Sequence, residues 1–247
     1  MAHSGMMEQQ VSDHEDAALL LRQPHQLFGV RHLKEMVRNG ELGDVYYIYS
    51  QRVNLGKVRR DENALWSFAP HDLSVILHLL ESEPIDVAAR GSAFLQGTVE
   101  DVVFLHLRFP GGRMAHVHVS WLDPHKLRKI TVVGSRKMVV FDDMEASEKI
   151  RVYDKGIDRP GNPMGQIVSY GDALSVRSGD ILIPKISLQE PLRIECQHFV
   201  DCVREHRTPL TDGADGLRVV RVLAAAQQSL AAGGTPMAVA PQPAGVA

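Results

Sequence analysis

The sequence has little cysteine, no long apolar run and no strong excess of charge of either sign. Its two cysteines, Cys196 and Cys202, would fall on different faces of a helix, so they predict neither a disulfide framework nor a metal site. This cysteine usage favours a reducing cytoplasm. No apolar run approaches the roughly 18 residues that a membrane-spanning helix needs, and the N-terminal residues lack the basic-then-apolar pattern of a signal peptide.

The charge balance also excludes some partners. A formal net charge of -3 and a pI near 6.5 provide no basic field that would gather nucleic acid or an anionic membrane. The hydrophobic share of 44% and the charged share of 23% are ordinary for a globular protein. We therefore expect neither nucleic acid nor a membrane as a partner.

A phosphate-binding glycine loop is missing as well. A dinucleotide site of the usual kind needs a Gly-rich turn between a strand and a helix, where the backbone can approach the pyrophosphate. The sequence contains no G-x-G-x-x-G and no Walker-type loop. The nearest imitation, 132–136, falls within a predicted hairpin. We therefore expect that this chain alone binds no dinucleotide.

Apolar spacing in the first third predicts two helices and a strand. The spacing favours a helix over 26–39 and then, from β-branched and aromatic residues, a strand over 44–49. A second helix is expected to begin at Pro70, because the first helical turn does not need the N–H that proline lacks.

The middle of the chain, 85–153, predicts consecutive strands. Its clearest hairpin joins 102–109 to 113–121 through Pro-Gly-Gly, and a second joins 130–133 to 138–141. A run of strands flanked by helices argues for an α+β fold, with an open, mostly antiparallel sheet and helices packed on one face.

We expect three regions along the chain. Residues 1–25 are predicted to be a flexible leader, 26–233 a single α+β domain, and 234–247 a disordered Ala/Pro-rich tail. Within the domain, 156–184 is dense in Gly, Pro, Asp and Ser and is predicted to be a long loop. Two helices with apolar stripes are expected after it.

Several short motifs, taken together and in this order, are similar to one protein family. They are Gly43–Ile48, Arg52–Gly56, Trp66–Asp72, Ser120–Lys126, Ile130–Gly134, Glu190–Leu192, Asp212–Gly213 and Gly216–Val220. The set resembles the glucose–fructose oxidoreductase/inositol dehydrogenase (Gfo/Idh/MocA) family. Within it, the set is most similar to the branch that acts on UDP-linked N-acetylhexosamines and their uronic acids. The resemblance covers about residues 27–237.

The resemblance implies a two-domain enzyme of which this chain holds one part. Members have an N-terminal Rossmann domain that binds NAD(P) and a C-terminal α+β domain, whose open sheet face often forms the oligomer interface. It implies the substrate-side domain of a UDP-N-acetylhexosamine-type dehydrogenase without its dinucleotide-binding domain, inactive alone. A UDP-sugar, a separate Rossmann subunit and further copies of the chain are the implied partners. The alternative is a non-catalytic sugar-nucleotide-binding or oligomerisation module left by truncation.

His71 matches the position of the family's catalytic histidine. A histidine suits proton transfer from a sugar hydroxyl because its ordinary pKa lies near working pH. Directly after Pro70 it would occupy a first helical turn, where the helix dipole disfavours imidazolium. Ser67 stands where many members have an aspartate, so a carboxylate–histidine relay is not implied. For an isolated histidine, capping or packing is the ordinary alternative.

The candidates for substrate contact carry guanidinium, carboxamide or indole groups, which suit a diphosphate, sugar hydroxyls and a sugar face. They are Arg52, Asn54, Arg59, Arg60, Asn63, Trp66 and Trp121. A solvated loop is the alternative for Arg59 and Arg60, and core packing is the alternative for Trp121.

Three histidines are predicted to share one face of the sheet. His116 and His118 alternate along one strand, and His106 lies on the strand predicted to pair with it. Three imidazoles could hold a transition metal. The neighbouring Arg108 argues against a metal, so we expect none and favour a polar or inter-subunit sheet face.

Overall fold

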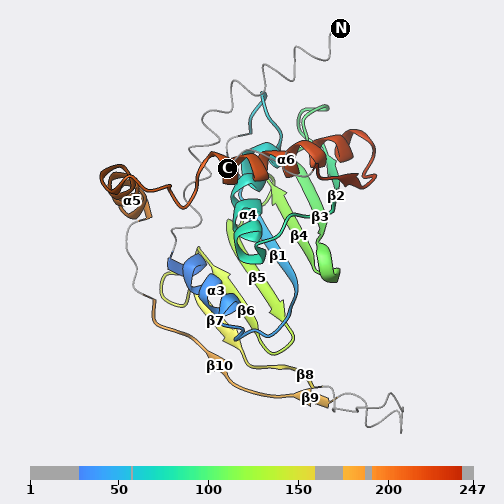
Figure 1. Cartoon of the computed structure of the whole chain (residues 1–247). Helices are drawn as coiled ribbons and strands as arrows, with labels where there is room; N and C mark the ends of the chain where they lie inside the picture. The colour runs from blue at the N-terminus through green and yellow to red at the C-terminus, as the bar shows by residue number, and fades with distance from the viewer. Residues whose placement is uncertain (1–27, 57, 159–174, 187–190, 241–247) are drawn as a thin grey trace.

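The computed structural model describes residues 28–56, 58–158, 175–186 and 191–240. Its centre is an open nine-stranded sheet in the order β10-β7-β6-β5-β1-β4-β3-β2-β11 (Figure 1). The pair β1 and β4 is parallel, and the other neighbours in this sheet are antiparallel. A separate ribbon pairs β8 with β9. The prediction of an α+β fold with a mostly antiparallel sheet is confirmed.

Up to residue 153, the elements follow the predicted order. The strands are β1 (Val45–Val53), β2 (Asp86–Ser92), β3 (Val102–Arg108), β4 (Met114–Ser120), β5 (Leu127–Gly134), β6 (Met138–Asp142), β7 (Ile150–Tyr153), β8 (Gly156–Asp158), β9 (Ser175–Arg177), β10 (Ile181–Leu182) and β11 (Met237–Ala238). The helices are α3 (Phe28–Arg38), α4 (Ala64–Leu80), α5 (Pro191–Glu205) and α6 (Gly213–Ala231), with a short 3₁₀ turn η2 (Pro110–Gly112).

Helices α3, α4 and α6 cover one face of the sheet, whereas α5 stands away from it (Figure 1). The covered face is apolar because every second residue of each strand points into it, as with Val103, Leu105 and Leu107 of β3, which are fully buried. At Gly29 a Cβ atom would collide with the ring of Phe141, so glycine allows α3 to approach β6 closely. The helices and the sheet thus enclose a single core.

Helix α4 begins earlier than the sequence suggests, and the predicted start at Pro70 is wrong. Asn63 is the N-cap: its side chain accepts a hydrogen bond of 3.2 Å from the N–H of Trp66. Pro70 therefore lies inside the helix, where it cannot donate to the carbonyl four residues earlier. Burial of the apolar residues of α4 outweighs this loss, and His71 lies in mid-helix rather than in a first turn.

Two further predictions need correction. The span predicted as a long loop, 156–184, contains β8, β9 and β10 within its described part. The tail predicted to be disordered contributes β11, which pairs with Asp86 and Val87 of β2. Val239, next to β11, is buried in the core, so apolar side chains hold this segment on the sheet. The predicted leader, 1–25, lies outside the described residues.

The two predicted C-terminal helices are confirmed as α5 and α6. Helix α6 packs against α4 and β2, and Asp212 caps it by accepting a hydrogen bond of 2.9 Å from the N–H of Asp215. In the described part of the chain, each helix is too short or too polar to cross a membrane.

Candidate functional site

A buried carboxylate links β1 to α4 at the centre of the candidate site. Ser50 and Arg52 are alternate residues of β1, so both point toward the helix layer. The Ser50 hydroxyl donates to Oδ1 of Asp72 on α4. Nε of Arg52 donates to Oδ2 of the same carboxylate at 2.5 Å. Asp72 is only 1% exposed, and both of its oxygens are thus occupied by β1.

A second arginine lies beside the first on the neighbouring strand. Arg128 of β5 is the direct cross-strand neighbour of Arg52 of β1. Side chains that are directly opposite on neighbouring strands lie on the same face, and like charges there repel each other. Arg128 is more exposed than Arg52 and reaches Asp143 at 3.6 Å. Two guanidinium groups are therefore gathered at one end of β1 with a carboxylate on either side.

His71 lies within the field of these charges. Its pKa falls from 6.5 to about 4, mainly because burial disfavours the charged imidazolium. Arg52 and Arg128 lower the pKa further, while Asp72 raises it and compensates in part. The imidazole is therefore neutral at neutral pH. The prediction that a helix dipole keeps His71 neutral is wrong, because His71 is not in a first turn.

The loop between β1 and α4 holds the other polar candidates. Asn54 follows β1 directly, is half-buried, and donates its backbone N–H to the carbonyl of Ser120 at 3.1 Å. Arg59 and Arg60 are exposed, and Arg59 pairs with Glu62 at 3.0 Å. These two arginines are surface loop residues in this structure and are not in contact with the Asp72 group.

Three predicted contact residues are engaged in structural roles. Asn63 caps α4 and also donates to Glu100 at 2.8 Å and to Gln227 at 3.0 Å. The indole N–H of Trp66 donates to the same Gln227 oxygen at 3.0 Å, which ties α4 to α6. Trp121 is 1% exposed and offers no ring face for stacking. We leave these three side chains out of the candidate site.

The structure adds residues that the sequence did not single out. Ser50, Asp72 and Arg128 lie with Arg52, and the charges of Arg52, Asp72 and Arg128 act on His71. Asp72 stands next to His71 in the sequence and could have been noticed. The position of Arg128 depends on the register between β1 and β5, for which the sequence contains no direct signal.

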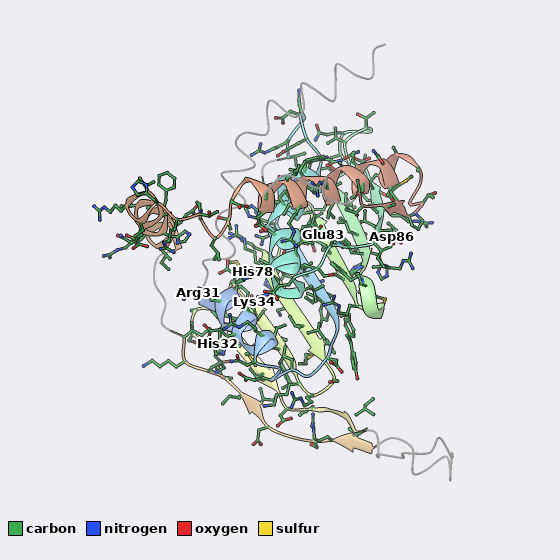
Figure 2. The ribbon with its side chains drawn as sticks, viewed as in Figure 1. Arg31, His32, Lys34, His78, Glu83 and Asp86 are labelled. Carbon is green, nitrogen blue, oxygen red and sulfur yellow. The ribbon has the colours of Figure 1, made fainter. Side chains whose placement is uncertain are left out.

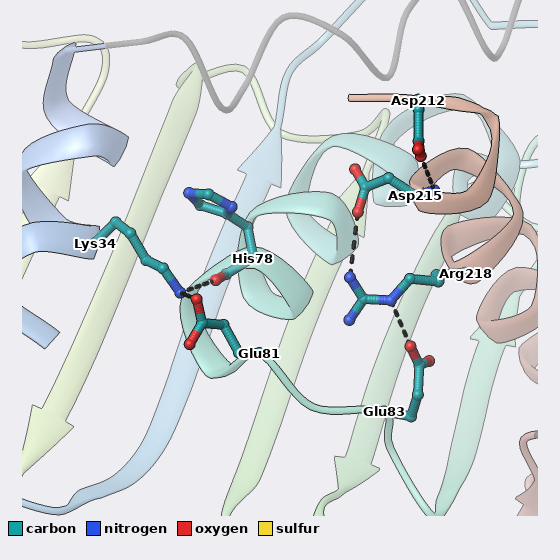
Figure 3. A network of polar contacts seen from close by, with 7 residues as sticks. All are labelled: Lys34, His78, Glu81, Glu83, Asp212, Asp215 and Arg218. Atoms are coloured by element: carbon teal, nitrogen blue, oxygen red, sulfur yellow. Dashed lines mark hydrogen bonds and ion pairs between the residues drawn. The ribbon is translucent and has the colours of Figure 1, made fainter. Parts of the chain in front are cut away.

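A second polar network lies at the C-terminal end of α4 (Figures 2 and 3). Lys34 of α3 donates to the carbonyl of His78 at 2.6 Å and pairs with Glu81 at 2.7 Å. Arg218 of α6 contacts both Glu83 and Asp215. This network joins the end of α4 to its neighbouring helices and is separate from the His71 site.

The sheet face without helices carries the predicted histidine group. His106 of β3 lies directly opposite His116 of β4, and the ring of Phe104 stacks on His118 with centroids 4.3 Å apart. Burial lowers the pKa of His116 and of His118. Among the described residues, no group of three or more His, Cys, Asp or Glu side chains is arranged to hold a metal ion. The prediction that these histidines share one face is confirmed.

The comparison with known families agrees with this architecture. Residues 30–140 match the family model described as the GFO/IDH/MocA C-terminal domain. Residues 30–140 are thus similar to the C-terminal domain of the Gfo/Idh/MocA oxidoreductases, and the family resemblance seen in the motifs is confirmed.

Individual relatives point in the same direction. The chain is 24% identical to UDP-N-acetylglucosamine 3-dehydrogenase of Acidithiobacillus ferrooxidans, over 87% of this chain and 66% of the relative. A solved structure of that enzyme has a TM-score of 0.67 at 18% identity, covering 86% of this chain and 61% of that one. An aldose–aldose oxidoreductase from Caulobacter crescentus, complexed with glycerol, also has a TM-score of 0.67, at 19% identity, with coverage of 87% and 62%.

One further neighbour was solved with a dinucleotide. It is an inositol dehydrogenase homologue from Azotobacter vinelandii, complexed with NADH and myo-inositol, with a TM-score of 0.65 at 16% identity. It is covered over 63% of its length by 88% of this chain. The chain thus spans about two thirds or less of the length of these relatives.

Proposed function

We propose that this chain is the substrate-side domain of an NAD(P)-dependent dehydrogenase that acts on a sugar nucleotide of the UDP-N-acetylhexosamine type. The observation that carries the proposal is the position of His71 beside the opposed pair Arg52 and Arg128. Two cations held on one face are stabilised by an anion between them, and guanidinium groups bind diphosphate oxygens well. The similarity to a UDP-N-acetylglucosamine dehydrogenase supports this choice of ligand.

In this proposal His71 accepts the proton of a sugar hydroxyl. The imidazole is neutral at working pH, so a ring nitrogen has a lone pair available. A pKa of about 4 makes it a weak base in the free chain. A bound diphosphate would offset the field of Arg52 and Arg128 and so raise the pKa of His71 toward its ordinary value. The base would therefore become stronger when the substrate is in place.

The described residues do not fit a dinucleotide. The turn from β1 to α4, residues 54–63, is the strand-to-helix turn at this site, yet it contains one glycine, Gly56. Two of the N-terminal N–H groups of α4 that a pyrophosphate would need are already bonded, that of Ala64 to the carbonyl of Glu100 and that of Trp66 to the side chain of Asn63. We therefore propose that a Rossmann domain outside the described residues holds NAD(P), and we assign no hydride-transfer step to the described residues.

We also propose that the open sheet face binds a second copy of the chain. Its centre carries exposed aromatic and apolar side chains, including Tyr47, Phe104 and Met114. Arg108, at the edge of this patch, is paired with Asp86 of β2. An apolar, aromatic centre with a charged rim is the usual composition of a stable protein interface.

Calorimetric titration with UDP-N-acetylglucosamine tests the proposed ligand. The unmodified chain should bind it, and Arg52→Gln should weaken binding by about tenfold or more, since a charged hydrogen-bond donor is lost. Arg207→Gln, which removes an exposed arginine paired with Glu205, is the matched control and should bind normally. No binding by the unmodified chain would overturn the proposal and favour an oligomerisation module without ligand.

A further inference from the structure

Asp72 is the residue that connects the charged groups of the site, although it does not itself face the ligand. Both of its oxygens accept hydrogen bonds from β1, one from Ser50 and one from Arg52. It is buried and therefore shielded from a bound substrate. A buried carboxylate is retained at low energetic cost only when its oxygens are paired in this way.

The position of Arg52 requires such a partner. Its direct neighbour across the sheet is Arg128, whose like charge would push the Arg52 side chain away. Within the described residues, Nε is the Arg52 side-chain atom that forms a hydrogen bond, and its acceptor is Asp72. The two terminal nitrogens of the guanidinium thereby remain available for an anionic ligand.

We propose that Asp72 is a positioning residue: its carboxylate, fixed by Ser50, holds the Arg52 guanidinium opposite Arg128 and beside His71. This proposal rests on the proposed function only in its second consequence, that Arg52 is thereby presented to the anionic part of the substrate. The first consequence, the effect on the field around His71, can be measured in the free chain.

The direction in which the pKa of His71 changes in an Asp72 variant distinguishes a positioning role from simple proximity. Asp72 by itself raises the pKa of His71, and Arg52 lowers it by more. If Asp72→Leu left Arg52 in place, the pKa of His71 would fall further. If Asp72 holds Arg52, the variant releases it, and the larger effect is lost, so the pKa of His71 should rise. NMR titration of the imidazole signals measures this shift directly.

Two reference variants complete this experiment. Arg52→Gln measures how far the pKa of His71 rises when the guanidinium is absent. Asp72→Leu should raise this pKa by a smaller amount. Ser50→Ala removes one of the two hydrogen bonds that fix Asp72 and should also raise the pKa slightly. If Asp72→Leu does not fold, as judged by circular dichroism, the pKa of His71 in Ser50→Ala tests the proposal instead. A fall or no change in the pKa of His71 in the folded variant would overturn the proposal.

Binding of UDP provides the second readout. Asp72→Leu should weaken UDP binding by about tenfold in the unmodified background, because Arg52 is no longer held. In the Arg52→Gln background the same change should cause no further loss, since residues that act through one another are not additive. Equal losses in both backgrounds would contradict positioning. If the unmodified chain fails to bind UDP, the proposed ligand is wrong, and the titration of His71 still decides the role of Asp72.

Discussion

Arg52 and Arg128 lie directly opposite each other on strands β1 and β5, on the sheet face that α4 covers. Like charges in this arrangement repel, and each is compensated by its own carboxylate, Asp72 for Arg52 and Asp143 for Arg128. The pair lies beside a histidine with a strongly lowered pKa. A perturbed histidine together with gathered cations is typical of a binding or catalytic site.

The first prediction concerns the response of His71 to an anion. In the free chain the pKa of His71 should be about 4. Saturating UDP should raise it, because the phosphate charge offsets Arg52 and Arg128. NMR titration with and without UDP measures both values. An unchanged pKa in the presence of bound UDP would place the phosphate away from the arginine pair.

The second prediction concerns stability and pH. The folded state lowers the pKa of His71, so the unfolded state binds a proton more readily between about pH 6.5 and about pH 4. The free energy of unfolding should therefore fall as the pH falls through this window. A His71→Gln variant should lose less stability over the same range. Urea unfolding at several pH values makes the comparison, and parallel losses in both proteins would contradict it.

The third prediction concerns the cap of α4. Asn63→Ala removes the acceptor for the N–H of Trp66 and two donors, to Glu100 and Gln227. The loss of a cap and of buried hydrogen bonds should lower the free energy of unfolding by about 2 kcal/mol. Asn63→Asp keeps the cap acceptor and loses the donors, and it places a negative charge beside Glu100. Chemical denaturation of both variants tests this, and an unaffected Asn63→Ala would exclude the structural role.

The fourth prediction concerns the open sheet face. If a second copy covers this face, His116 and His118 become more buried, and their protonation opposes association. The nearby charged and titratable groups are His106, which lowers the pKa of His116, and Asp123, which raises that of His118. Association should weaken as the pH falls from about 7 to about 5.

Sedimentation equilibrium at several pH values measures this association. His118→Gln keeps a neutral polar side chain beside Phe104, so its dimer should be less sensitive to acid. A monomer at every pH would show that the open face does not bind a second copy. A dimer of equal strength at pH about 7 and about 5 would exclude the histidines from the interface.

The sequence predicts the fold well and the site in part. Alternation and turn residues located the hairpin of β3 and β4, since these signals are local. Motif similarity pointed to Arg52 and His71. The pairing of Arg52 with Arg128 was missed because register between strands distant in the sequence is a tertiary property. The predicted start of α4 is wrong because Pro70 is compatible with a first turn as well as with this helix interior, although Asn63 before an apolar run is itself an N-cap signal.

A crystal structure of the chain with UDP-N-acetylglucosamine tests the central claim most directly. The diphosphate should lie within hydrogen-bonding distance of the Arg52 and Arg128 guanidinium groups, with a sugar hydroxyl facing a ring nitrogen of His71. A ligand bound elsewhere, with the arginine pair still held by Asp72 and Asp143 and free of phosphate, would contradict the assignment of this site.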